Sequence, residues 1–118
     1  MSSPVVQWQI VAKDPDEVAR FYRKLFGWKI STNNALGYRE VAAEEGGIPG
    51  GIWPAPPEAH NFVQLFVAVQ DIEQAVEDAT QLGARVIVPP SALPEGGTMA
   101  VLLDPSGMPF CVTRRVPA

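Results

Sequence analysis

The stretch VQWQIVAKD at residues 6–14 returns in a related form as VQLFVAVQD at residues 63–71. Gln7 matches Gln64 and Asp14 matches Asp71, and both pairs are 57 residues apart. A fixed repeat distance is the sequence signature of one structural unit used twice. The repeat therefore predicts two units of one design, with a site where the units face each other.

Each copy of the repeat leads into an amphipathic helix. Asp14 can cap a helix that begins at Pro15, and Gly27 can end it in the left-handed conformation. Asp71 stands at the corresponding position before the second helix, and Gly83 stands at the corresponding position after it. Apolar residues at helical spacing predict two buried stripes. They are Val18, Phe21, Tyr22, Leu25 and Phe26 in the first helix, and Ile72, Ala75, Val76, Ala79 and Leu82 in the second.

Short β-rich segments bounded by glycine and proline surround both helices. The strand candidates are residues 5–12, 28–31, 38–43 and 48–53 around the first helix, and 63–69, 85–88, 98–103 and 108–113 around the second. Pro89 and Pro90 should end their strand because neither can donate to a ladder. The pattern predicts an α+β protein with two βαβββ units, at about 4–54 and 61–115, in a single domain spanning residues 1–118.

Composition limits the class of protein. The chain has 118 residues, 47% of them hydrophobic and 19% charged, which suits one soluble globular domain. A net charge of −4 disfavours nucleic acid and anionic membranes as partners. The start lacks the pattern of a leader, and no apolar run is long enough to cross a bilayer. Cys111 is the single cysteine, which suits a reducing compartment, so we expect a cytoplasmic protein.

Two motifs connect the repeat to a known family. FYRKLFGW at residues 21–28, followed by DPSGMPF at residues 104–110, resembles the vicinal oxygen chelate superfamily of glyoxalase I, bleomycin-resistance proteins and extradiol dioxygenases. The resemblance covers nearly the whole chain. It implies a glyoxalase-like fold, in which curved mixed sheets form a concave cleft, and a homodimer. We expect Phe21, Tyr22 and Phe26 of the first motif to serve packing.

Strand alternation sorts the side chains of the predicted sheets into two faces. If Trp8 and Ile10 pack beneath the first helix, Gln7 and Gln9 point to the opposite face. The residues predicted to line the cleft are Gln7, Gln9, Trp53, Gln64, Phe66, Cys111 and Thr113. Amides beside flat apolar side chains suit a small, partly aromatic ligand. The alternative is that Trp53 and Phe66 only fill the core.

The resemblance also places four metal-ligand points on this chain. In metal enzymes of the family the ligands occupy positions that match Gln7, residues 50–53, Gln64 and Cys111. Neutral amides are weak ligands, and residues 50–53 carry no carboxylate or imidazole. We therefore expect no cofactor, with a divalent metal as the alternative. His60, the one histidine, is expected in a solvated connection.

Three functions remain open at this point. The first is a metal-independent protein that binds a small molecule, as bleomycin-resistance proteins do. The second is a metal-dependent lyase, isomerase or dioxygenase of the vicinal oxygen chelate type with an unusual ligand set. The third is a non-catalytic assembly or regulatory module. The missing histidines favour the first, and the sequence leaves open whether the protein is an enzyme.

Overall fold

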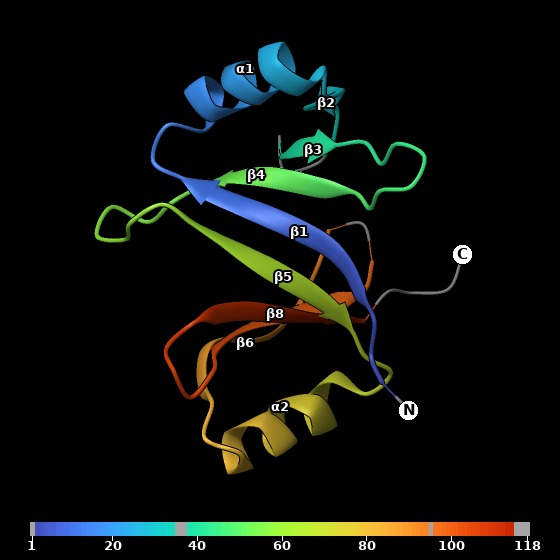
Figure 1. The fold of residues 1–118 in the computed structure, drawn as a ribbon. Coiled ribbons are helices and arrows are strands. Elements are labelled where there is room, and N and C mark those ends of the chain that lie inside the picture. Colours follow the sequence, from blue (N-terminus) through green and yellow to red (C-terminus); the bar gives the residue numbers. More distant parts are fainter. Residues whose placement is uncertain (1, 35–37, 95, 115–118) are drawn as a thin grey trace. The chain divides into compact units, whose positions relative to one another are not determined.

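The computed structural model describes residues 2–34, 38–94 and 96–114, so the ends of the predicted domain, residue 1 and residues 115–118, lie outside the described part. The order of strand, helix and three strands occurs twice, which confirms the predicted α+β class (Figure 1). The first set is β1 (Val5–Ala12), α1 (Pro15–Phe26), β2 (Ile30–Ser31), β3 (Arg39–Val41) and β4 (Gly50–Pro54). The second set is β5 (Phe62–Ala68), α2 (Ile72–Gln81), β6 (Arg85–Ala92), β7 (Thr98–Leu103) and β8 (Pro109–Arg114).

The contacts divide the chain into two compact units, one of residues 7–63 and one of residues from 64 onward together with the first six. In the first unit the hydrogen-bonded strand order is β2-β3-β4-β1, and β1 runs parallel to β4. In the second unit the order is β5-β8-β7-β6, and β5 runs parallel to β8. The two units therefore share one connectivity, as the repeat predicts.

The first unit has its core between α1 and the sheet. Ala19 of the helix is buried with Val41 and Ile52 of the strands, and Trp8 and Ile10 of β1 pack against this cluster. The helix begins as predicted, because the side chain of Asp14 accepts a hydrogen bond from the backbone N–H of Glu17 at 3.0 Å. It ends at Gly27, which has the left-handed φ of 71°.

The predicted burial of the α1 stripe is wrong at three of its five positions. Phe21, Leu25 and Phe26 are 56%, 57% and 60% exposed, whereas Ala19 is the buried residue of the helix. The reason is that α1 turns the side carrying the small Ala19 to the sheet, which leaves the larger side chains of the stripe toward solvent. Tyr22 does pack, since its ring stacks on Trp28 with the centroids 4.8 Å apart.

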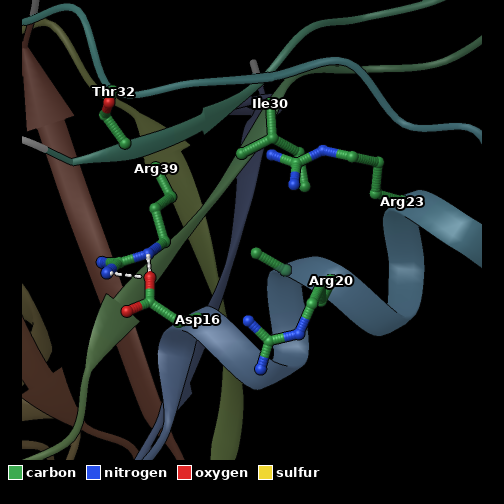
Figure 2. A pocket seen from close by; sticks show the side chains of 7 residues that line it. Asp16, Arg20, Arg23, Ile30, Thr32 and Arg39 are labelled. Atoms are coloured by element: carbon green, nitrogen blue, oxygen red, sulfur yellow. Dashed lines mark hydrogen bonds and ion pairs between the residues drawn. The ribbon is translucent and has the colours of Figure 1, made fainter.

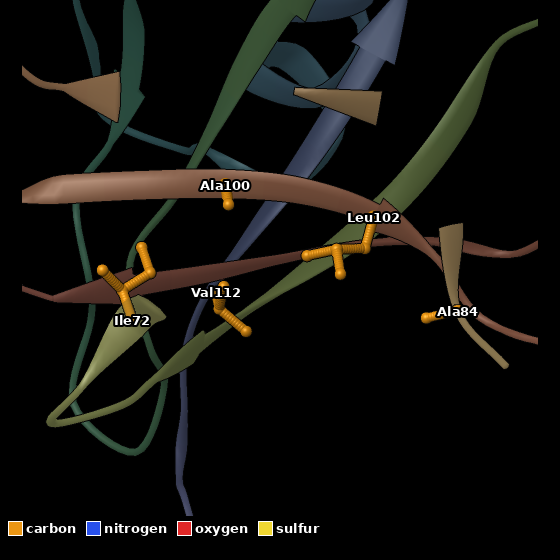
Figure 3. Packing of buried hydrophobic residues seen from close by; sticks show 5 residues of the cluster. All are labelled: Ile72, Ala84, Ala100, Leu102 and Val112. Atoms are coloured by element: carbon orange, nitrogen blue, oxygen red, sulfur yellow. The ribbon is translucent and has the colours of Figure 1, made fainter. Parts of the chain in front are cut away.

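The second unit has a separate core beneath α2 (Figure 3). Its buried residues are Ile72, Ala84, Ala100, Leu102 and Val112. The helix contacts β6, β7 and β8. It is capped like α1, because the side chain of Asp71 accepts from the backbone N–H of Gln74 at 3.1 Å. Leu82 was expected in the buried stripe but is 80% exposed, because the helix ends at Gln81 and the chain turns there.

Strand β6 is longer than predicted and passes through Pro89 and Pro90. It lies at the end of the strand order, beside β7 alone, where a proline need not donate to a second neighbour. The pairing with β7 also shifts register between Val88 and Ser91, so the two prolines fall at an irregularity. An edge strand with a bulge therefore tolerates two prolines, which a central strand would not.

The second family motif forms the turn between β7 and β8. The carboxylate of Asp104 accepts hydrogen bonds from the Ser106 hydroxyl, the Ser106 N–H and the Met108 N–H. These bonds lower the pKa of Asp104 below its usual value, and the bond from the Ser106 hydroxyl has the largest effect. Gly107 supplies the positive φ of 90° that closes the turn. The motif therefore serves backbone geometry.

Among the described residues, neither α1 nor α2 has the length and apolar character needed to cross a bilayer.

Candidate functional site

Strand β1 presents two amides on the face away from α1. Trp8 and Ile10 pack against the core beneath the helix, so alternation puts Gln7 and Gln9 on the opposite face of the sheet. Gln9 is buried and Gln7 is half-buried. Two glutamines on one strand face therefore lie within the structure and not on a solvated edge.

Both amides donate to one phenol. The Nε2 atoms of Gln7 and Gln9 lie 3.4 and 3.3 Å from the Oη atom of Tyr38. Asn34 holds the backbone of Tyr38, because its side chain accepts from the Tyr38 N–H at 2.8 Å and donates to the Tyr38 carbonyl at 2.6 Å. The Tyr38 ring packs against Trp53 with the centroids 5.5 Å apart. These contacts join two amides, a phenol and an indole in one cluster.

Tyr38 was not among the residues predicted to line the cleft, although β4 contains a signal that points to it. Glycine inside a strand marks a close approach of other atoms. A Cβ atom built on Gly51 would lie 1.7 Å from the Tyr38 oxygen, so only glycine leaves room for the ring. At Gly50 the same test gives 2.0 Å to the Trp8 ring. The glycine pair therefore lets one aromatic ring approach β4 at each position.

The remaining predicted site residues lie in the second unit, on the face opposite the α2 core. Gln64, Phe66, Cys111 and Thr113 are all buried. Phe66 is the register partner of Cys111, and the Thr113 hydroxyl donates to the carbonyl of Thr98 at 3.2 Å. The structure thus makes Phe66 and Cys111 neighbours in the second unit, and in the first unit it brings Gln7, Gln9 and Trp53 together around Tyr38.

Cys111 is not a reactive thiol. Its side chain is completely buried, and this burial raises the pKa of the thiol to about 12. Burial thus favours the neutral thiol over the thiolate, which is the form that acts as a nucleophile. A buried neutral thiol of this kind packs like a small apolar side chain.

The residues at the four family ligand points do not fit a transition metal. Gln7 and Gln64 offer only neutral amides, residues 50–53 carry no ligand side chain, and Cys111 is the one thiol among the four points. Metals of this class prefer imidazole, carboxylate and thiolate. Among the described residues there is no group of three or more His, Cys, Asp or Glu side chains that could hold a metal ion. His60 is exposed, as expected for a solvated connection.

Two hollows of the first unit lie outside the predicted site. One, of about 190 Å³, is lined by Asp16, Ala19, Arg20, Arg23, Ile30, Thr32 and Arg39 (Figure 2). The other, of about 420 Å³, is lined by Ile10, Ala12, Glu17, Val18, Phe21, Tyr22, Asn61, Phe62 and Val63. Neither hollow was predicted from the sequence, because both are lined by residues of α1, where the apolar stripe was expected to be buried.

Comparison with known proteins gives a family match. The sequence model of the family described as "Glyoxalase-like domain" matches residues 6–113. Two curated proteins named "Putative glyoxylase CFP32", from Mycobacterium bovis and Mycobacterium tuberculosis, are 30% identical over 112 residues. The match covers 92% of this chain and 43% of theirs, so the chain spans less than half the length of these relatives.

Solved structures share the fold at low sequence identity. Hypothetical protein BH1468 from Bacillus halodurans C-125 has a TM-score of 0.71 and 15% identity, over 100% of this chain and 98% of that one. The methylmalonyl-CoA epimerase from Mycobacterium tuberculosis has a TM-score of 0.66 and 15% identity, over 96% of this chain and 88% of that one. At this identity the similarity shows the fold alone.

Proposed function

Because the chain belongs to the glyoxalase-like domain family, we propose that it binds a small, partly aromatic molecule without a transition metal. It is a protein of the glyoxalase, bleomycin-resistance and dioxygenase type. The proposed binding residues are Gln7, Gln9, Trp53, Gln64, Phe66, Cys111 and Thr113, to which we add Tyr38. We further propose that both units belong to one domain, and that the protein is cytoplasmic and does not bind nucleic acid.

The observation that carries this proposal is the cluster of Gln7, Gln9, Tyr38 and Trp53. Two amides that meet one phenol oxygen place donors and acceptors beside an aromatic surface. Binding sites for small molecules typically combine a few fixed polar groups with such apolar surface. Aromatic ligands gain from offset or edge-to-face packing on rings like that of Trp53.

The chemistry of the second group supports binding more than catalysis. Its members are a neutral amide, a phenyl ring, a protonated thiol and a hydroxyl, namely Gln64, Phe66, Cys111 and Thr113. A general base needs a pKa near the working pH, and a hydroxyl becomes a nucleophile only beside such a base; none of these four side chains can act as that base. Amides and a hydroxyl can instead orient the polar groups of a ligand.

A thermal-shift screen against small aromatic compounds tests the proposal. A ligand that binds only the folded state adds about 2.7 kcal/mol to the free energy of unfolding at a hundred times its dissociation constant. We expect Gln7→Ala, Gln64→Ala and Tyr38→Phe to fold nearly as well as the parent and to lose most of the ligand-induced shift. Gln70→Ala, which removes an exposed glutamine, is the matched control and should keep the shift.

Two results would refute the proposal. One is a screen in which no compound raises the unfolding temperature. The other is near-stoichiometric transition metal in the purified protein that disappears in Gln64→Ala, because that result would support the metal-dependent alternative.

A further inference from the structure

The smaller hollow of the first unit collects positive charge in an acidic protein. Arg20 and Arg23 reach it from α1 and Arg39 reaches it from β3, while Asp16 is its one acidic side chain (Figure 2). Three guanidinium groups and one carboxylate give the hollow a formal charge of +2, although the chain as a whole carries −4. The arginines make up a third of the nine basic residues of the protein.

Asp16 already forms an ion pair with Arg39. The Nε and Nη2 atoms of Arg39 lie 2.9 and 2.5 Å from the same Asp16 oxygen. The Arg39 side chain is only 20% exposed, so this pair fixes the guanidinium against the rim of the hollow. The pair neutralises Asp16, and the excess charge therefore belongs to Arg20 and Arg23.

Arg20 and Arg23 have no such partner. They are three residues apart on α1, a spacing that puts two side chains on neighbouring parts of a helix surface, where like charges repel. Within the described part of the chain, neither side chain makes a hydrogen bond or an ion pair. An anion in the hollow would relieve this repulsion, and the Thr32 hydroxyl on the lining could donate a further bond.

We propose that this hollow binds the dianionic phosphate group of a small phosphate monoester. Guanidinium groups match phosphate oxygens in geometry and form charge-assisted, often bidentate hydrogen bonds. A phosphate monoester carries between −1.5 and −2 charges at pH 7, which balances the excess of about +2. About 190 Å³ corresponds to roughly six water molecules at liquid density. That space suits a phosphate group and is smaller than the pockets that enclose whole drug-sized ligands.

The phosphate site is separate from the proposed ligand site. Arg39 and Tyr38 are adjacent in the chain, so alternation directs their side chains to opposite faces of the sheet. Tyr38 meets Gln7 and Gln9, whereas Arg39 meets Asp16 of α1. Shifts near Arg20, Arg23 and Arg39 therefore report on the phosphate site, whereas shifts near Gln7, Gln9 and Tyr38 report on the proposed aromatic ligand site.

The experiment is a titration of the whole protein with phenyl phosphate at constant ionic strength, followed by NMR of the backbone amides. We expect saturable shifts near Arg20, Arg23, Thr32 and Arg39, and competition by inorganic phosphate. Arg20→Gln/Arg23→Gln should weaken binding about tenfold or more, the loss expected for one charge-assisted hydrogen bond. Both positions are exposed, so the variant should fold.

Lys13→Gln/Arg85→Gln is the matched control, because it removes two exposed positive charges that do not line the hollow. It should bind phenyl phosphate like the parent. Equal weakening in both double variants would mean that net charge alone attracts the anion, and would overturn the site. Shifts that stay linear up to tens of millimolar, or binding to phosphatidic acid vesicles but not to phenyl phosphate, would overturn it as well.

Discussion

Cys111 lies in β8 opposite Val101 of β7 and Phe66 of β5, with its side chain completely buried. Desolvation raises the pKa of its thiol to about 12, against 9.0 for an exposed cysteine. Above pH 9 the unfolded chain releases a proton that the folded protein retains. The free energy of unfolding should therefore fall as the pH rises from 9 toward 12, by at most about 1.4 kcal/mol per pH unit. Below pH 9 both states hold the proton, and the thiol adds no pH dependence.

Urea unfolding at pH 8, 9 and 10 checks this prediction against Cys111→Ala. Cys111→Ala lacks the thiol, and any other group that titrates in this range is present in both proteins. The stability difference between parent and variant should therefore shrink as the pH rises. A difference that stays constant across the three pH values would contradict a raised thiol pKa.

Part of the candidate site could be predicted from single residues of the sequence. Alternation along the first strand correctly predicts that Gln7 and Gln9 point away from α1, since Trp8 and Ile10 pack in the core. It could not reveal Tyr38, because the contact joins residues 29 to 31 positions apart and depends on the space left by Gly51. The binding role of these residues stays a prediction.

Helices α1 and α2 begin with the same device, in which an aspartate accepts a hydrogen bond from the N–H three residues later. We expect Asp14→Ala and Asp71→Ala each to lower the free energy of unfolding by about 1 kcal/mol, the usual loss for such a cap. Denaturant unfolding provides the measurement. Glu73→Ala, which removes an exposed acidic residue of the first turn of α2, should cost less. If that control costs as much as Asp71→Ala, the helix dipole and not the cap explains the effect.

Element order and helix ends were predictable because they depend on local signals. Capping residues, glycines with positive φ and a repeated spacing each act within a few positions of the chain. The burial of the α1 stripe was not predictable, since it depends on which side of the helix meets the sheet. The extension of β6 through Pro89 and Pro90 was missed for a similar reason, because only the strand order makes β6 an edge.

At the scale of the molecule, the exposed apolar side chains of α1 need a partner. Phe21, Leu25 and Phe26 together with the adjacent groove form more apolar surface than single scattered residues would. We predict that a second copy of this chain covers this surface in a homodimer. Charge supports that occupant, because α1 is acidic in its first turn and basic in its last. Two copies of α1 packed antiparallel about a two-fold axis would bring Glu17 of each near Lys24 of the other.

Light scattering at micromolar concentration should therefore give a mass twice that of the 12.7 kDa chain. Leu25→Glu places a charge on the proposed interface at a position that is already exposed, so it should fold and shift the protein toward monomer. Leu82→Glu adds the same charge at an exposed leucine outside α1 and should remain dimeric. A monomeric parent would refute the dimer, and a dimer that survives Leu25→Glu would mean that another surface forms the interface.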